Sequence, residues 1–437
     1  MELKSFLLRV LQDKGYIHQC TDLEGLDALA ESGHITAYVG FDATADSLHV
    51  GSLVSLMMLR LLKMAGGTPI ALLGTGTTKI GDPSDKNVQR PMLSDEQIRA
   101  NVEGIKKSIE PLLFPKANTP LPNRAKMIEN GDWLNGNDFL EFMRKVGPHF
   151  TVNRMLTMEF VRNRLENQLP LTMLEFNYMI LQAYDFVELH QRENCVLQMG
   201  GSDQWGNIVN GIELGRRMHG AQLFGLTTPL ITTSSGTKMG KTGEGKTIWL
   251  NAEKTSVYEY FQFWRNVDDA DVFRFLLLFT DLMPIHVDAF RELVAKDPAA
   301  INVAKEALAL EATKILHGEW AAKTALETSR AAFAGEGDST EGLPSMPFTA
   351  GMTVFDAVLG LGLATSKNEV RRLCTQGGIK INGTMLLAPS GTDDPVAVTG
   401  DTVLDQNNVE DGMIRVSVGK KKRGIINVNH AVENATV

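Results

Sequence analysis

Short apolar runs alternate with amphipathic stretches through the first half of the chain. Residues 34–41 and 69–73 have the pattern of buried strands, and residues 50–65 between them repeat apolar side chains at helical spacing. A later strand is expected over 195–199 and a helix over 204–218. Strands that alternate with helices are typical of a parallel sheet covered on both faces. The pattern therefore predicts an α/β fold for this part of the chain.

Helical patterns follow the first strands. Amphipathic stretches over 95–113, 137–145 and 153–167 are separated by a segment rich in Pro and Asn. We interpret residues from about 111 to 170 as a helical insertion into the sheet domain.

Three further segments follow residue 250. Helical spacing over 257–279 and 302–333 predicts an all-helical domain. Residues 334–350 are rich in Gly, Ser, Pro and acidic residues, which is the composition of a linker. Residues 351–437 combine an apolar helical pattern, a basic helix over 367–373 and short β-like runs between Gly turns. They predict a small α+β domain.

The composition is that of a folded protein in a reducing compartment. The chain has 437 residues, 43% of them hydrophobic, which exceeds the size of one core and predicts two or three domains. Its 3 cysteines are widely separated and give neither a zinc motif nor a disulfide framework. No segment has the apolar length of a signal peptide or a membrane span. A cytoplasmic location without membrane attachment is expected.

Charge is unevenly distributed along the chain. The formal net charge is -9, yet residues 351–437 contain nine basic and nine acidic residues. The acidic excess therefore lies before residue 351, and the C-terminal part repels RNA least.

A candidate nucleotide site lies where the first strand passes through a polar loop into the helix over 50–65. The carboxyl end of a parallel strand and the amino end of the next helix together favour an anionic phosphate. His49 adds hydrogen-bond donors there, and Gly51 lets a base approach the backbone. A helix-start role for His49 and a packing role for Gly51 explain the same pattern equally well.

A second candidate element is the glycine-rich segment 236–246, which contains Lys238, Lys241 and Lys246. Lysines in such a segment can close over a triphosphate and neutralise the charge that moves onto the leaving pyrophosphate. A carboxylate nucleophile is already ionised at neutral pH, so such a step needs no general base. A solvated surface turn is the alternative.

A polar stripe lies on an otherwise apolar helix expected over 174–189. Tyr178, Gln182 and Asp185 occupy positions i, i+4 and i+7 and therefore share one face. Such a stripe either faces solvent or lines an internal polar pocket. Spacing alone favours the solvent-facing alternative, because charged groups are rarely buried without partners.

Two short motifs carry a resemblance to a known family. Residues 49–52 (HVGS) and 238–242 (KMGKT) resemble the HIGH and KMSKS signatures of class I aminoacyl-tRNA synthetases, in the same order and at similar spacing. The segments FDATADSLHVG, IGDPSD, LQAYDF and GGSDQWGNI are similar to bacterial tyrosyl-tRNA synthetases. One departure is Ser52, where the family has a second histidine; serine still donates a hydrogen bond but is shorter and uncharged.

The resemblance implies an activity and its partners. The implied enzyme is a tyrosine–tRNA ligase that activates L-tyrosine with ATP, releases pyrophosphate and transfers the tyrosyl group to tRNA(Tyr). It implies Mg²⁺ with the ATP, no protein-bound zinc or other metal site, and a homodimer. Two rivals remain: another adenylyl-transferring enzyme of this architecture, such as a tryptophanyl relative, and an RNA-binding protein that has kept the fold without the activity.

The same resemblance implies a role for individual residues. Tyrosine is expected to contact Tyr38 and Asp185 at its hydroxyl, Asp82, Tyr178 and Gln182 at its ammonium group, and Gln204. ATP is expected to contact Gly40, Asp42, His49, Gly51, Asp203 and Lys241. The expected catalytic residues are Thr44, His49, Ser52, Lys238, Lys241 and Thr242. Lys86 and Arg90 match family positions near the pyrophosphate or the tRNA end.

The C-terminal module resembles a small RNA-binding domain of a ribosomal small-subunit protein. Its expected contacts to tRNA phosphates are Lys367, Arg371, Arg372, Lys420, Lys421, Lys422 and Arg423. For the run 420–423 alone, a solvated surface is an equal alternative. The expected domains are a Rossmann-like catalytic domain (1–250), a helical domain on the tRNA anticodon side (251–333), a linker (334–350) and this RNA-binding domain (351–437).

Overall fold

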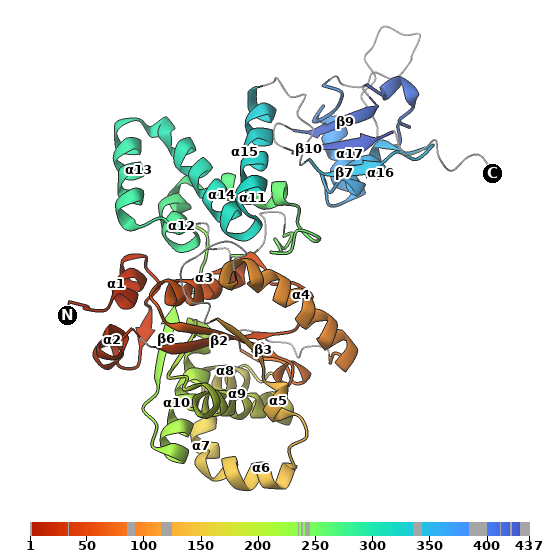
Figure 1. The fold of residues 1–437 in the computed structure, drawn as a ribbon. Helices are drawn as coiled ribbons and strands as arrows, with labels where there is room; N and C mark the ends of the chain where they lie inside the picture. Colours follow the sequence, from red (N-terminus) through yellow and green to blue (C-terminus); the bar gives the residue numbers. More distant parts are fainter. Residues whose placement is uncertain are drawn as a thin grey trace. The chain divides into compact units, whose positions relative to one another are not determined.

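The computed structural model describes most of the chain. The described residues are 2–33, 35–84, 92–114, 125–234, 236, 239–240, 245–334, 343–383, 400–410, 412–419 and 422–428. The chain divides into two compact units, whose helices and strands are drawn in Figure 1. The first unit contains Met1–Thr255 and Phe263–Glu319, and the second contains Ser256–Gln262 and Trp320–Val437.

A six-stranded sheet forms the centre of the first unit. Its order is β1 (Gln19–Cys20), β6 (Phe224–Thr228), β5 (Leu197–Gly201), β2 (Thr36–Asp42), β3 (Thr68–Gly74) and β4 (Lys126–Glu129). The strands from β6 to β4 are parallel to one another, and β1 pairs antiparallel with β6 at the edge. Figure 1 shows α3 (Val50–Met64) and α4 (Asp95–Leu113) on one face, and α9 (Met173–Glu193) and α10 (Trp205–His219) on the other.

The remaining helices of the first unit are shorter or lie beyond the sheet. They are α1 (Phe6–Asp13), α2 (Leu23–Glu31), α5 (Gly131–Leu134), α6 (Phe139–Val146), α7 (Val152–Met155), α8 (Glu159–Glu166), α12 (Val272–Phe279), α13 (Pro284–Lys296) and α14 (Ile301–His317). Two further helices, α11 (Val257–Arg265) and α15 (Glu319–Ala334), contain residues of both units.

The direction in which the sheet grows reverses between β2 and β5. From β2 the chain passes through α3 to β3 on one side, whereas from β5 it passes through α10 to β6 on the other. The loops that leave β2 and β5 at their carboxyl ends therefore diverge and leave a crevice between them. In open α/β sheets, ligands bind at such a switch point.

Most predicted elements of the first unit are confirmed. β2, α3, β3, α4, α9 and α10 lie within a few residues of the expected ranges, while the strand expected over 195–199 is β5, shifted by two residues. The stretch 153–167 is not one helix but two, α7 and α8, because Met158 has an extended backbone conformation. Gly318, with a φ of 88°, likewise separates α14 from α15.

The strand β4 was not predicted. It lies within residues 111–170, which were expected to be helical, and pairs in parallel with β3. Its sequence, KMIE, is short and carries a charge at each end, so it lacks the apolar run of the other strands. Pairing with the buried β3 decides its conformation, and periodicity within four residues cannot show that.

The N-terminal segment holds the end of α12 in the first unit. The buried ammonium group of Lys14 donates to the backbone carbonyls of Leu277 and Thr280, at 3.1 and 2.8 Å. The hydroxyl of Tyr16 donates to the carbonyl of Leu278. Carbonyls at a helix C-terminus have no partners within the helix, so these side chains satisfy groups that burial would otherwise penalise.

The second unit contains a four-stranded sheet in the order β7 (Ser345–Pro347), β10 (Lys422–Asn427), β9 (Met413–Val418) and β8 (Ile379–Ile381). Two helices, α16 (Val354–Gly360) and α17 (Lys367–Thr375), complete this part, and a core that includes Phe355 and Ile414 holds it together. The predicted basic helix is therefore confirmed as α17. β7 lies within the residues expected to form a linker, and Met346 at its centre packs against this core.

The class of fold is as predicted: mixed α/β, with a parallel sheet and many helices. The domain boundaries at residues 250, 333 and 350 stay a prediction. Among the described helices, none combines the length and the apolar character that crossing a lipid bilayer requires.

Candidate active site

A cavity of about 460 Å³ opens at the switch point of the sheet in the first unit. Its walls come from the carboxyl ends of β2 and β5, the first turn of α3 and one face of α9. The expected tyrosine, ATP and catalytic residues that the structure describes all line it: Tyr38, Gly40, Asp42, Thr44, His49, Gly51, Ser52, Asp82, Tyr178, Gln182, Asp185, Asp203 and Gln204. The structure therefore brings together residues that are up to 166 positions apart in the sequence.

Five expected residues of this region lie outside the described residues. They are Lys86, Arg90, Lys238, Lys241 and Thr242. The positions of their side chains stay predictions, although Met239 and Gly240, between the two lysines, are described.

His49 caps the first turn of α3. Its Nδ1 accepts a hydrogen bond of 2.9 Å from the backbone N–H of Gly51. A neutral imidazole that accepts at Nδ1 carries its proton on Nε2, so the outer nitrogen is a donor. The ring also meets the indole of Trp249 edge to face, with 6.2 Å between the centroids. The helix-start role and the ligand-binding role are therefore compatible in this residue.

The glycine-rich segment reaches the N-terminal end of α3, which we call the mouth of this helix. A Cβ atom added to Gly51 would lie 2.9 Å from the carbonyl oxygen of Met239, and one added to Gly240 would lie 3.1 Å from Nδ1 of His49. Gly240 itself has a φ of 127°, which side chains rarely allow. The backbone between Lys238 and Lys241 thus lies against the helix mouth, which explains why both contact positions are glycine.

The polar stripe of α9 lines the cavity and does not face solvent. Tyr178 and Asp185 are 6% and 2% exposed, respectively. The hydroxyl of Tyr178 donates to a carboxylate oxygen of Asp42, at 3.1 Å, and the amide nitrogen of Gln182 donates to Gln204, at 3.2 Å. The solvent-facing alternative is therefore wrong.

Two residues that the sequence did not identify hold the carboxylate of Asp185. The side-chain amide of Asn130 donates to one oxygen at 3.0 Å, and the indole N–H of Trp133 donates to the other at 2.8 Å. Asn130 directly follows β4, so recognition of that strand would have placed it at the ligand-binding edge of the sheet. No pattern in the sequence around Trp133 indicated that its side chain belongs to the site.

Asp82 also lines the cavity and is held by Gln204, whose amide nitrogen donates to it at 2.9 Å. Burial, and then the charge of Asp42, raise the pKa of Asp82 to about 6. Burial raises the pKa of Asp185 to about 7, although the hydrogen bonds from Asn130 and Trp133 oppose the rise. Carboxylates crowded in this way favour a cation between them.

Hydrogen-bonding capacity remains free in this cavity. Among the described residues, neither the hydroxyl of Tyr38 nor Oε1 of Gln182 has a hydrogen-bond partner, although both atoms are buried. Buried polar atoms without partners are costly, and a ligand can satisfy them. Both residues belong to the expected tyrosine contacts.

The expected RNA contacts lie in the second unit. Lys367 and Arg371 on α17 both lie over the ring of Phe355, with their charged groups 5.6 and 5.2 Å from its centroid. Arg372 is exposed on the same helix, and Lys422 and Arg423 lie on β10. Lys420 and Lys421 lie outside the described residues.

Comparison with known proteins identifies the family. Residues 30–334 match the family of tRNA synthetases class I (W and Y). The match covers more than half of the chain, so the chain belongs to this family of aminoacyl-tRNA synthetases.

Curated relatives and solved structures show which members of this family the chain resembles. The tyrosine–tRNA ligase of Xanthobacter autotrophicus is 52% identical to this chain, over 97% of the chain and 98% of the relative. The tyrosine–tRNA ligase of Rhodospirillum rubrum is 50% identical over the same shares. The structure of a C-terminally truncated mitochondrial tyrosyl-tRNA synthetase from Aspergillus nidulans is 29% identical and gives a TM-score of 0.67, covering 76% of this chain and 94% of that chain.

The raised pKa values give the stability of the protein a pH dependence. The folded state keeps protons on Asp82 and Asp185 that the unfolded chain releases, so their contribution to the free energy of unfolding falls as pH rises from about 4 to about 7. Asp185→Asn should reduce this decline, measured by urea unfolding at a series of pH values and one protein concentration. Asp288→Asn, on the exposed face of α13, is the control. Equal slopes for Asp185→Asn and wild type would contradict the burial of an ionisable group here.

Proposed function

We propose that the cavity of the first unit binds L-tyrosine and ATP side by side and joins them. The chain is an enzyme, a tyrosine–tRNA ligase: it activates L-tyrosine with ATP, releases pyrophosphate and transfers the tyrosyl group to tRNA(Tyr). The observation that most supports the tyrosine specificity is the buried carboxylate of Asp185, fixed by Asn130 and Trp133 at the end of the cavity.

The part of the cavity around Asp185 and Tyr38 can form hydrogen bonds with the hydroxyl of tyrosine. Asp185 and Tyr38 both line the cavity and offer an acceptor and a donor, since the hydroxyl of Tyr38 has no partner in the part of the chain that the structure describes. A site built around a substrate hydroxyl leaves these polar groups unpaired when phenylalanine enters, so phenylalanine is rejected. The tryptophanyl alternative, which the family alone leaves open, is disfavoured by the relatives of 52% and 50% identity, both of which are named tyrosine–tRNA ligases.

The ammonium group of tyrosine is placed near Asp82, Tyr178 and Gln182. Asp82 is an anion that a cation stabilises, and Oε1 of Gln182 lacks a partner among the described residues. The carboxylate of tyrosine then points toward the mouth of α3, where the α-phosphate of ATP is proposed to bind.

Activation is an in-line displacement at the α-phosphate. The tyrosine carboxylate forms a bond to phosphorus as the bond to pyrophosphate breaks. The Nε2–H of His49 and the positive end of the α3 dipole stabilise the negative charge on the phosphate oxygens, with the side chains of Thr44 and Ser52 as further donors. Lys238 and Lys241 are proposed to neutralise the leaving pyrophosphate, and Asp42 and Asp203 to accept from the ribose.

Mg²⁺ is proposed to enter with the ATP, held mainly by phosphate oxygens and water. It supplies positive charge to the leaving pyrophosphate. Within the ranges that the structure describes, no three His, Cys, Asp or Glu side chains gather to hold a metal ion. The expected lack of zinc and the cytoplasmic location stay predictions.

The second unit is proposed to hold tRNA. Lys367 and Arg371 form a pair of cations over one aromatic ring, and such clusters attract phosphates. Removing residues from Met352 onward should leave tyrosine-dependent pyrophosphate exchange unchanged and lower the rate of tRNA charging by roughly tenfold or more, because one set of weak tRNA contacts is lost. Normal tRNA charging by the truncated enzyme would refute this role.

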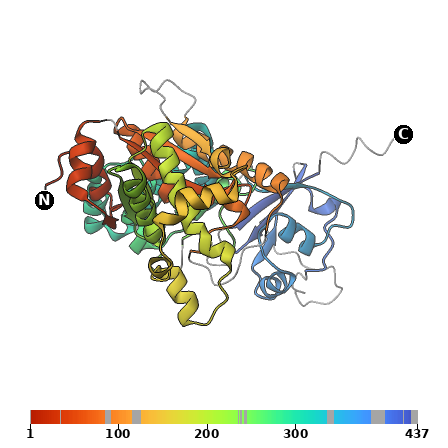
Figure 2. The same ribbon diagram turned by 90° about the horizontal axis from the view of Figure 1, so that it is seen from below.

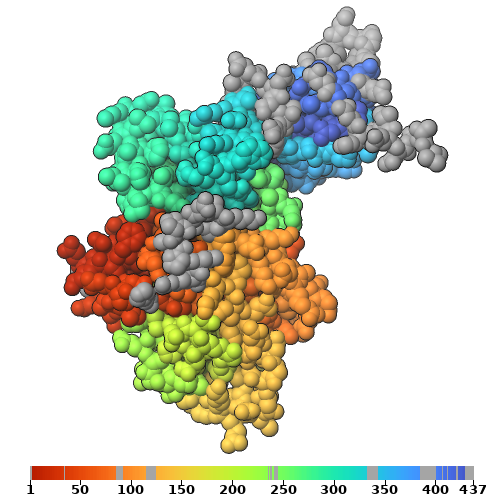
Figure 3. Space-filling view, viewed as in Figure 1, coloured from red at the N-terminus to blue at the C-terminus, as the bar shows by residue number. Residues whose placement is uncertain are grey.

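A second copy of the chain is the proposed partner of an apolar surface on the first unit. Its exposed residues lie on α6 to α9 and the segments between them: Phe139, Leu140, Met143, Val152, Leu156, Leu165 and Met173. Figure 1 shows α6 and α7 beyond α9, on the side away from the sheet, and Figures 2 and 3 show this yellow part of the chain at the edge of the unit. Large exposed apolar surfaces are typical of interfaces.

The homodimer is tested by sedimentation of the full chain. Wild type should sediment as a dimer at micromolar concentration, and Leu140→Asp should shift it toward the monomer because a charge would be buried at the interface. Val303→Asp, at an exposed apolar position on α14, is the control. A monomeric wild type would refute the proposal.

The amino-acid specificity is tested by pyrophosphate exchange with each amino acid in turn. Wild type should respond to tyrosine, and Asp185→Ala should lower kcat/KM for tyrosine by roughly 10- to 150-fold, since a hydrogen bond to a charged group contributes about 1.5–3 kcal/mol. Its kcat/KM for phenylalanine should not fall. Asp185→Asn serves as a second variant of similar shape, and Asp288→Ala as the control. Unchanged selectivity between the two amino acids would rule out the role of Asp185.

A further inference from the structure

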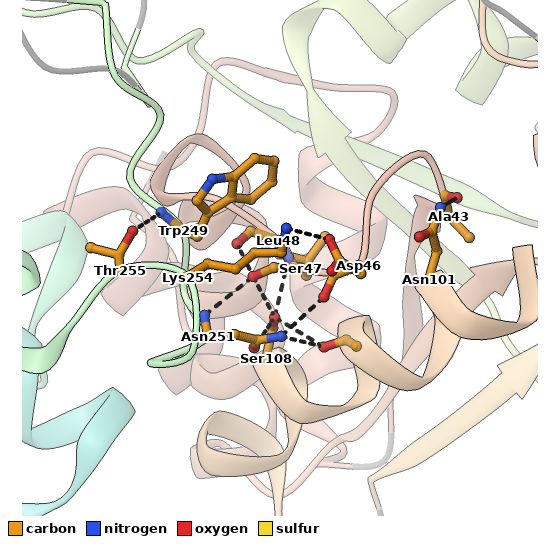
Figure 4. Close-up of polar contacts among 11 residues, drawn as sticks. Ala43, Asp46, Ser47, Leu48, Asn101, Ser108, Trp249, Asn251, Lys254 and Thr255 are labelled. Carbon is orange, nitrogen blue, oxygen red and sulfur yellow. Dashed lines mark hydrogen bonds and ion pairs between the residues drawn. The ribbon is translucent and has the colours of Figure 1, made fainter. Parts of the chain in front are cut away.

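Three segments that are distant in the sequence meet beside the cavity of the first unit. They are the loop 43–48 that leads into α3, the outer face of α4 and the segment 248–255 that follows the glycine-rich loop. Figure 4 shows that their polar groups point toward one another and are joined by a network of hydrogen bonds.

The face of α4 that meets the loop is built to receive its backbone. Asn101, Gly104 and Ser108 follow one another at helical spacing and share this face. The amide of Asn101 donates to the carbonyl of Ala43 at 2.8 Å, and the hydroxyl of Ser108 accepts from the N–H of Leu48 at 3.1 Å. A Cβ atom on Gly104 would lie 2.0 Å from the carbonyl oxygen of Asp46. These contacts therefore allow loop 43–48 to pack against α4 in one position only.

Asn251 joins the third segment to the other two. Its side-chain amide donates to the carbonyls of Asp46, at 3.1 Å, and Gly104, at 2.9 Å, while its Oδ1 accepts from the hydroxyl of Ser108 at 2.7 Å. Its backbone N–H donates to the hydroxyl of Ser47 at 3.2 Å. Asn251 is only 7% exposed, so each of these bonds forms in a site shielded from water.

The joined segments adjoin the two parts of the proposed ATP site, which are His49 and the glycine-rich loop. Loop 43–48 ends at His49, and the segment 248–255 begins just after the glycine-rich loop. Backbone hydrogen bonds run between them from Val50 to Ile248, at 3.0 Å, and from Leu250 to Leu48, at 2.8 Å. Lys254 adds an ion pair of 2.6 Å to Asp46 and lies over the ring of Trp249, which in turn contacts His49.

We propose that Asn251 is a positioning residue for the activation of tyrosine. It does not line the cavity itself, whereas Ser47 and Leu48, to which its segment bonds, do. By fixing the segment that follows the glycine-rich loop to the N-terminal end of α3, Asn251 sets the position of the loop backbone at Met239 and Gly240 relative to His49. Displacements of an ångström between reacting groups can cost about 100-fold in rate. This inference rests on the proposed function, because it needs tyrosine activation as the step that is positioned.

The test compares Asn251→Ala and Ser108→Ala with wild type in the full-length enzyme. At saturating tyrosine and ATP, Asn251→Ala should lower the rate constant for tyrosyl-adenylate formation by roughly 10- to 100-fold and raise the KM for ATP. The dissociation constant of tyrosine, measured by equilibrium dialysis without ATP, should change less than about twofold, because tyrosine binds to other walls of the cavity. Asn167→Ala, an exposed asparagine at the end of α8, is the matched control.

A double variant separates positioning from general destabilisation. Because Asn251 and Ser108 share one hydrogen bond, their combined effect on the rate should be smaller than the product of the single effects. Ser108→Ala carries the test alone if Asn251→Ala does not fold. An unchanged rate constant with a lowered unfolding temperature, or tyrosine binding weakened as much as the rate, would overturn the proposal. A wild type without any tyrosine-dependent exchange would instead refute the proposed function.

Discussion

The backbone of Met239 and Gly240 lies against the first turn of α3, and this contact determines how the cavity can act on a nucleotide. It requires glycine at residues 51 and 240, where any side chain would meet backbone or the ring of His49. A helix mouth alone binds a phosphate, but it cannot neutralise charge that moves away onto pyrophosphate during the reaction. The loop whose backbone reaches this helix end is the proposed source of that second charge, and the network around Asn251 fixes the segment that follows the loop.

The other end of the cavity depends on buried acidic groups. Asp42, Asp82 and Asp185 occupy one small cavity, and burial raises the pKa of the last two. Such a site is unfavourable when empty, because carboxylates repel one another and lose hydration. A ligand with an ammonium group and a phenolic hydroxyl relieves both problems. The features that destabilise the free protein near neutral pH are therefore the ones that we propose to select the amino acid.

The sequence predicted the residues of this site better than the contacts that hold them. Helical spacing placed Tyr178, Gln182 and Asp185 on one face, but only packing against the sheet shows that the face is buried. Asn130 and Asn251 could not be recognised, since their partners lie up to 205 positions away and neither residue belongs to a periodic pattern. Motifs report residues that meet ligands, whereas positioning residues depend on tertiary contacts that local patterns do not contain.

A crystal structure of the enzyme with tyrosine and a non-hydrolysable ATP analogue tests the central claim most directly. The account predicts that the α-phosphate lies at the first turn of α3 within hydrogen-bond distance of Nε2 of His49, and that Lys238 and Lys241 contact the outer phosphates from the other side. Lysines that stay in solvent while the nucleotide is bound, or a triphosphate held away from α3, would contradict it.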